Sequence, residues 1–161
     1  MEGMNSRLFL PLAACLLLPT CQEQITRITD LADLPVKSED APDFNWSTSP
    51  LRANAQYILF QANTRGGRRL LKGDYYFLTW YDAEPEKPVR IIMHYTQAAT
   101  GSEVKTLTVN YKEPRESCGT RREKFFFNGE ERQKLGDIMS WRIELYCGGR
   151  LADSRQSYLW E

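Results

Sequence analysis

The clearest indication of the fold is in residues 139–147, Met139-Ser140-Trp141-Arg142-Ile143-Glu144-Leu145-Tyr146-Cys147. Its apolar and polar side chains alternate, with Met139, Trp141, Ile143, Leu145 and Cys147 on one side and Ser140, Arg142, Glu144 and Tyr146 on the other. Successive side chains of a β-strand point to opposite faces, so the pattern predicts a strand with one buried and one solvated face. The Gly148-Gly149 pair that follows is typical of a tight hairpin turn into the next strand.

Short runs rich in β-branched and aromatic residues continue outward from this strand, separated by turn residues. They predict strands near 55–63, 73–82, 88–96, 103–111, 122–128, 138–147 and 151–160. Pro85, Pro88 and Pro114 fall between the runs or at their starts, where proline does not interrupt a ladder. Seven short strands without a strong helix favour an all-β, seven-stranded Greek-key sandwich over residues 53–161.

The last third of the chain also resembles the closing strands of fibronectin type III and immunoglobulin-like domains. The stretch that carries the resemblance runs from Leu135 through Trp141 and the Gly148-Gly149 turn to Trp160. It implies an immunoglobulin-like sandwich and brings no site residue with it. More broadly, the chain is similar to small exported bacterial proteins of unassigned function.

The N-terminus has the pattern of an export signal. Leu8 to Thr20 is apolar apart from its last residue. A helix of that length spans about 20 Å, which is too short for a hydrocarbon core of about 30 Å but matches the apolar region of a signal peptide. We therefore expect the protein to be exported, to the periplasm, outer membrane or cell envelope of a bacterium.

The leader further resembles the signals of bacterial lipoproteins, which end in a cysteine preceded by small and apolar residues. Leu12-Ala13-Ala14-Cys15 matches the local pattern better, but cleavage there leaves Leu16-Leu17-Leu18 at the mature start. Leu18-Pro19-Thr20-Cys21 keeps the whole apolar region and precedes polar residues. A third interpretation is that both cysteines are ordinary leader residues. We predict a signal over 1–21, a lipid on Cys21, and membrane attachment by that lipid rather than by a transmembrane helix.

Residues 22–52 are predicted to be a polar linker. Prolines and the run Ser47-Thr48-Ser49-Pro50 interrupt regular structure. The spacing of Ile25, Ile28, Leu31 and Leu34 allows one short amphipathic helical turn within the linker.

Two cysteines, Cys118 and Cys147, remain in the predicted domain. The first precedes the fifth predicted strand and the second ends the sixth, so both fall at one end of the sandwich. In an exported protein this placement predicts a disulfide between them, with two free thiols as the alternative.

Charge and side-chain chemistry argue against several functions. Lys+Arg and Asp+Glu both number 21, without the basic excess typical of nucleic-acid binders. His94 is the single histidine and is expected to face away from Met93 and Tyr95 on its strand. Metal-ligand spacings and phosphate-binding glycine loops are missing, so we predict no metal, no cofactor and no catalytic residue.

The aromatic residues suggest binding instead. They concentrate in the runs 75–81 and 125–127 and at Tyr95, in excess of what a sandwich core needs. Candidate contacts for a ligand or partner are Trp46, Trp80, Tyr81 and Tyr95. We expect a non-enzymatic binding or assembly module for an envelope protein or a glycan. The alternatives are a small envelope hydrolase using a carboxylate pair, and a protein inhibitor acting through the loop 112–122.

Overall fold

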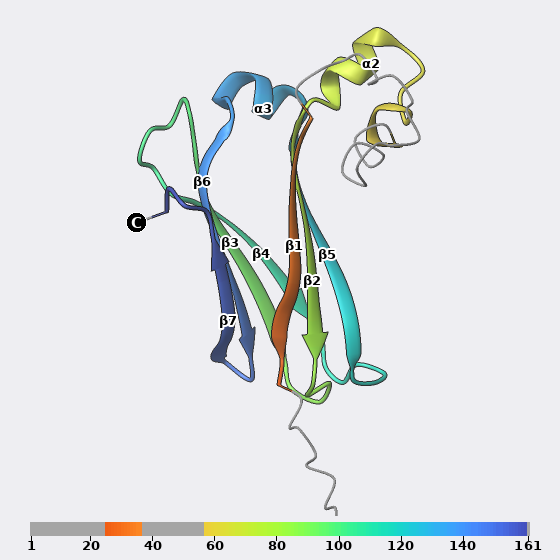
Figure 1. Cartoon of the computed structure of the whole chain (residues 1–161), viewed down its shortest axis with the longest axis vertical. Coiled ribbons are helices and arrows are strands. Elements are labelled where there is room, and N and C mark those ends of the chain that lie inside the picture. Colours follow the sequence, from red (N-terminus) through yellow and green to blue (C-terminus); the bar gives the residue numbers. More distant parts are fainter. Residues whose placement is uncertain (1–24, 37–56, 161) are drawn as a thin grey trace, which may run out of the picture.

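The computed structural model describes residues 25–36 and 57–160, so the predicted signal with Cys15 and Cys21, and also Trp46, lie outside the described residues. The described chain is all-β, with two short helices and one further helical turn. Its seven strands are β1 (Arg27–Val36), β2 (Gly73–Asp82), β3 (Val89–Gln97), β4 (Lys105–Tyr111), β5 (Gly119–Asn128), β6 (Ile138–Cys147) and β7 (Arg150–Gln156). They form two antiparallel sheets, in the orders β1-β2-β5 and β4-β3-β6-β7 (Figure 1).

The main core lies between the two sheets. From β2, Tyr76, Leu78 and Trp80 point inward. The other sheet contributes alternate residues of its two central strands, Val89, Ile91, Met93 and Tyr95 of β3 and Ile143, Leu145 and Cys147 of β6. The two-residue period of each strand thus separates a buried face from an outer one.

Six of the seven predicted strands are confirmed, and β2 and β6 have the predicted bounds. In β6 the alternation holds from Trp141 to Cys147, but Met139 is 50% exposed. The pairing of β3 with β6 shifts register between Thr96 and Gln97, opposite this part of β6. The irregularity falls where the strand leaves the core.

The first predicted strand is wrong. Within 55–63, the described residues begin with a helical turn at 57–59, and the sheet position belongs instead to β1, inside the predicted linker. The register of β1 shifts between Ile28 and Asp30, which inserts one extra residue. Ile28 and Leu31 therefore both reach the main core despite a spacing of three residues. That bulge is why a strand has helix-like apolar spacing in the sequence.

A second, smaller core lies on the outer face of the three-stranded sheet. Leu34, Val36, Ile58, Leu59 and Tyr75 are its buried members. Because β1 occupies the edge beside β2, the apolar run at 57–60 cannot add there as a strand, and part of it packs over the sheet.

The helices α2 (Arg65–Leu70) and α3 (Gly129–Leu135) sit at the same end of the sandwich (Figure 1). Asp74 fixes α3 there, because it accepts hydrogen bonds from Arg132 Nε at 2.8 Å and from the Ile138 amide at 3.3 Å. β2 begins at Gly73, where a Cβ atom would lie 2.0 Å from the Phe127 carbonyl oxygen. At the opposite end, Gly148 and Gly149 form the predicted hairpin turn with φ of 56° and 79°.

Across the described ranges 25–36 and 57–160, neither helix is long and apolar enough to span a membrane.

Candidate functional site

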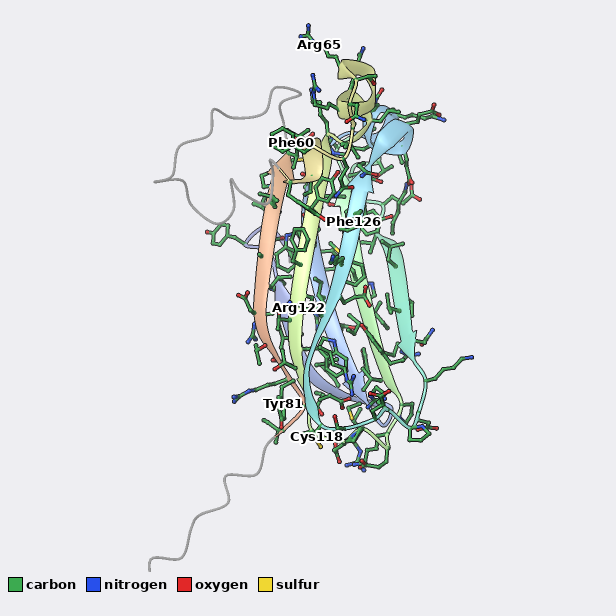
Figure 2. The ribbon with its side chains drawn as sticks, turned by 90° about the vertical axis from the view of Figure 1, so that its right-hand side faces the viewer. Phe60, Arg65, Tyr81, Cys118, Arg122 and Phe126 are labelled. Atoms are coloured by element: carbon green, nitrogen blue, oxygen red, sulfur yellow. The ribbon has the colours of Figure 1, made fainter. Side chains whose placement is uncertain are left out.

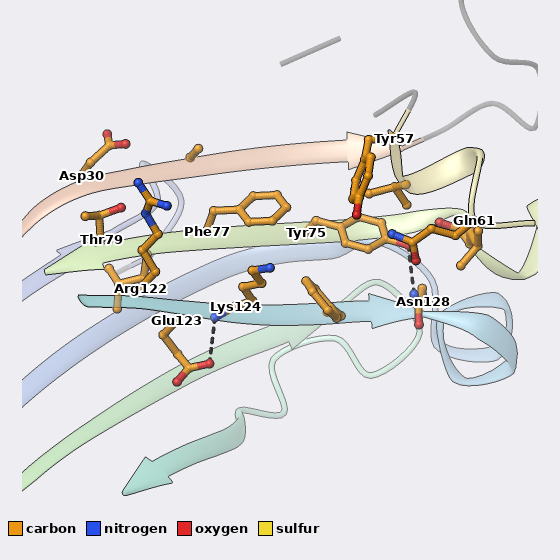
Figure 3. Close-up of a pocket in the computed structure, with 15 residues that line it drawn as sticks. Asp30, Tyr57, Gln61, Tyr75, Phe77, Thr79, Arg122, Glu123, Lys124 and Asn128 are labelled. Atoms are coloured by element: carbon orange, nitrogen blue, oxygen red, sulfur yellow. Dashed lines mark hydrogen bonds between the residues drawn. The ribbon is translucent and has the colours of Figure 1, made fainter. Parts of the chain in front are cut away.

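The outer face of the three-stranded sheet carries a groove of about 510 Å³. We call it the aromatic groove; its lining residues come from three strands and from the segments on either side of α2. They are Asp30 and Ala32 of β1, Tyr75, Phe77, Leu78 and Thr79 of β2, Arg122, Glu123, Lys124, Phe126 and Asn128 of β5, and Tyr57, Ile58, Gln61 and Leu71 (Figure 3). The strand period produces the floor, since Tyr75, Phe77 and Thr79 alternate with the inward residues of β2.

The aromatic half of the groove is built by cross-strand pairing. Tyr75 lies opposite Phe126 in the register of β2 and β5, with ring centroids 5.2 Å apart. Phe77 is the next aromatic residue along β2 and lies 6.3 Å from the Phe126 ring. Phe126 is 51% exposed, so a large apolar surface stays open to solvent here (Figure 2).

Tyr75 is held in place by two hydrogen bonds at the closed end of the groove. Its hydroxyl donates to the Leu71 carbonyl at 2.5 Å and accepts from Asn128 Nδ2 at 2.9 Å (Figure 3). Burial raises the pKa of Tyr75, and the Asn128 hydrogen bond offsets only part of this effect. The phenol therefore stays neutral and presents a fixed ring to the groove.

The other half of the groove is charged. Thr79 lies opposite Arg122, and Phe77 opposite Lys124, so both cations share the outer face with the aromatic rings. Neither cationic group makes a hydrogen bond or ion pair with any residue that the structure describes. Glu123 points the other way, and its carboxylate accepts a hydrogen bond from the Tyr111 hydroxyl at 2.5 Å.

The predicted contact role is wrong for two residues. Trp80 is fully buried and Tyr95 nearly so, because both lie on the inward faces of their strands. Tyr81 is half-buried and is not part of the groove lining. The groove instead uses Tyr75, Phe77 and Phe126, which belong to the aromatic runs noted in the sequence but lie on the opposite side of the strands from the core residues.

The outer face of the four-stranded sheet carries a connected polar network around Glu144. Its carboxylate accepts a hydrogen bond from the Tyr146 hydroxyl at 2.9 Å, pairs with Arg142 at 2.9 Å, and lies 3.4 Å from His94 Nε2. The hydrogen bond to Glu144, followed by burial, raises the pKa of Tyr146. His94 faces away from Met93 and Tyr95 as predicted, and its ring lies 6.2 Å from that of Trp160.

Asp82 anchors the end of the sandwich opposite the helices. It is fully buried and accepts hydrogen bonds from Arg115 Nε at 2.5 Å and Arg121 Nε at 2.8 Å. Burial alone would raise the pKa of Asp82, but the hydrogen bonds and charges of the two arginines outweigh burial and lower it. The ion pair between this carboxylate and Arg115 has a structural role, because it joins the loop at Arg115 to β2.

The predicted disulfide is not present in the structure, where Cys118 and Cys147 are both free. The two thiols do lie at the same end of the sandwich, next to the consecutive residues Ala83 and Glu84. Cys118 Sγ donates to the Ala83 carbonyl at 3.2 Å, and Cys147 Sγ lies 3.6 Å from the Glu84 carboxylate. Each thiol thus has its own acceptor. Burial raises the pKa of Cys147, although a hydrogen bond with Thr26 acts in the other direction.

In the described parts of the chain, no three or more histidine, cysteine or acidic side chains gather as a metal site would require. Comparison with family models, with curated proteins and with solved structures gives no match to this chain. The proposals that follow therefore depend on the geometry of the aromatic groove and on the sequence.

Proposed function

We propose that this protein is a non-enzymatic binding module and that the aromatic groove is its ligand site. The observation that carries the proposal is the pre-formed surface of the half-exposed Phe126 ring and the partly buried Phe77 ring, supported by the buried Tyr75 ring, beside two cations that have no ionic partner among the described residues. A groove of about 510 Å³ falls within the size range of small-ligand sites, and its mixture of aromatic and few polar groups is typical of them. A Tyr75 ring fixed by hydrogen bonds reduces the ordering cost of binding.

The proposal includes export and a lipid on Cys21, for which the leader sequence is the support. With β1 beginning at Arg27, five residues lie between that strand and Cys21. The six Cα-to-Cα steps from Cys21 to Arg27 reach about 20 Å when fully extended. An anchored domain would thus stay close to the membrane surface, with the Asp82 end toward it and the groove extending away along β2 and β5.

We also propose that the sandwich is of the Greek-key, immunoglobulin or fibronectin type III-like kind. The supporting observation is the division into β1-β2-β5 and β4-β3-β6-β7, in which the chain passes between sheets from β2 to β3, from β4 to β5 and from β5 to β6.

Two observations weigh against the alternatives from the sequence. A hydrolase of the paired-carboxylate kind needs two carboxylates facing one space. In the groove, Asp30 is on the outer face, whereas the Glu123 carboxylate is bonded to Tyr111 on the other side of β5. An inhibitor loop needs to protrude, but Arg115 in the middle of the loop 112–118 is buried against Asp82.

Fragment mapping by NMR tests the binding role. The chain from residue 22 onward, labelled with ¹⁵N, is titrated with a library of small sugars, carboxylates and short peptides. We expect shifts confined to the outer-face residues of β2 and β5, and their loss in Phe126→Ala. Leu151→Ala is the matched control, since Leu151 is 49% exposed on the other sheet. Shifts scattered over the surface, or none, would refute the role of the groove.

A further inference from the structure

We infer that the aromatic groove binds an acidic glycan, a polysaccharide whose sugars carry carboxylate, sulfate or phosphate groups. This inference rests on the proposed function and names the chemical class of its ligand. Three features of the groove support it: an open stacking surface, neutral hydrogen-bonding groups around that surface, and two cations beside it that pair with none of the described residues.

The stacking surface is open on one side. The rings of Phe77 and Phe126 lie on the floor of the groove, and Phe126 is half exposed although its neighbour Phe127 is buried. A sugar ring has an apolar C–H face and a polar rim, so one face can cover an aromatic ring while the hydroxyl groups stay in water. An acyl chain gains its binding energy by leaving water on all sides, which an open floor does not provide.

Neutral polar groups surround the rings. Gln61 and Tyr57 lie at the closed end, Asn128 beside Tyr75, and Thr79 at the charged end. Amide and hydroxyl groups both donate and accept hydrogen bonds, which suits ligands whose hydroxyl groups do the same. The Asn128 amide already donates one hydrogen bond to Tyr75, which fixes its position for a ligand.

The cations give the groove its preference for acidic sugars. Arg122 and Lys124 are two residues apart on one face of β5, so their Cα atoms are about 7 Å apart along the strand. Lys124 lies opposite Phe77 in the register, next to the stacking surface. Because neither side chain has an ionic partner among the described residues, both can pair with charges on a bound chain. Arginine binds carboxylate, sulfate or phosphate through two parallel N–H groups.

Binding to a panel of immobilised polysaccharides tests the inference. The acidic probes are polygalacturonate, alginate, hyaluronan and dextran sulfate; the neutral ones are dextran and carboxyl-reduced polygalacturonate. We expect the chain from residue 22 onward to bind at least one acidic probe at least about tenfold more tightly than the neutral ones. The affinity should fall as salt is raised, because the contact is partly ionic.

Variants separate a built site from general attraction. Phe126→Ala and the double variant Arg122→Gln, Lys124→Gln should each weaken binding about tenfold or more, and the double variant should also lose the preference for acidic probes. Leu151→Ala should bind as the parent does. Arg69→Gln with Lys72→Gln removes two cations outside the groove and should have little effect.

The contrary outcomes are distinct. If no acidic probe binds while the fragments still map to the groove, the glycan inference is wrong and the binding role stands. If neither fragments nor polysaccharides reach the groove, both are wrong. If an acidic probe binds equally well to Phe126→Ala but is lost with Arg69→Gln and Lys72→Gln, binding is a general effect of basic surface and the inference fails.

Discussion

The two sheets of this sandwich differ most on their outer faces. On the four-stranded sheet, the charged groups contact one another: Glu144 is shared by Tyr146, Arg142 and His94, and Arg90 lies over the Tyr146 ring at 5.1 Å. On the three-stranded sheet, Arg122 and Lys124 have no such partners among the described residues, and Phe126 is half exposed. Both faces rest on the same core.

This difference shows where the fold requires its residues and where it does not. A connected network contributes to the stability of its own sheet, and its shared carboxylate is already occupied by protein groups. Cations without a partner in the described part of the chain, and rings open to solvent, add little to folding, since exposed side chains away from special contacts change stability only slightly. We therefore expect substitutions in the core and in the network to reduce stability, and substitutions in the aromatic groove to reduce binding.

The largest expected effect belongs to Asp82→Ala, which removes the carboxylate shared by Arg115 and Arg121. Removing one partner of a buried ion pair leaves an uncompensated charge and costs about 3–5 kcal/mol. Asp30→Ala in the groove should cost less than about 0.5 kcal/mol. Urea unfolding at pH 7 measures both. Equal losses for the two aspartates would contradict the distinction between core and groove.

The same aspartate should make stability depend on pH. Its pKa is lowered in the folded protein, so its contribution is complete above the unfolded value of about 3.9 and is lost as the pH falls through the folded pKa. Urea midpoints between pH 2.5 and 7 should show this loss in the parent chain. The part of the acid dependence that Asp82 supplies should be missing in Asp82→Ala.

Phe126 and Phe127 offer the most direct comparison, because adjacent residues of β5 serve opposite faces. Phe127→Ala leaves a cavity in the core and should lower the free energy of unfolding by about 3–5 kcal/mol. Phe126→Ala removes a half-exposed ring and should lower it by about 1 kcal/mol. Thermal and urea unfolding measure the two. A larger loss for Phe126 would mean that the groove is part of the folding core rather than a ligand surface.

Among substitutions on the two outer faces, Glu144→Ala should reduce the free energy of unfolding more than Lys124→Ala does. Glu144→Ala leaves the Tyr146 hydroxyl and Arg142 without their acceptor, which should lower the free energy of unfolding by about 1–2 kcal/mol. Lys124→Ala, its counterpart in the groove, should stay within about 0.5 kcal/mol of the parent. If the two variants are equally stable, the network on the four-stranded sheet does not stabilise it.

The smallest effect concerns the two thiols, Cys118 in the loop before β5 and Cys147 at the end of β6. With both free, Cys118 should react first with iodoacetamide, because it is exposed while burial raises the pKa of Cys147 and only the thiolate reacts. Intact mass under non-reducing conditions, measured with and without alkylation, reports both the number of reacted thiols and the presence of a disulfide. A mass two hydrogens lower, with no alkylation of the native protein, would mean that the sheets are joined by the disulfide predicted from the sequence.

The sequence predicted six strands because their evidence is local. In β6 the alternation from Trp141 to Cys147 and the Gly148-Gly149 turn are contained in neighbouring residues, and both are found in the structure. β1 was missed because a bulge after Ile28 changes the spacing of its core residues from two to three. The run at 57–60 was mistaken for a strand because its β-forming residues were judged without knowing that the sheet edge beside β2 is taken.

For the candidate site, too, some features follow from the sequence and others are visible only in the structure. From the sequence alone it follows that aromatic residues concentrate in the runs 75–81 and 125–127, and that neighbours within a strand face opposite ways. The inward orientation of Trp80 and Tyr95, and the outward orientation of Tyr75, Phe77 and Phe126, are seen first in the folded protein. This is because the strand period fixes which residues share a face, whereas the packing of one sheet on another fixes which face is buried.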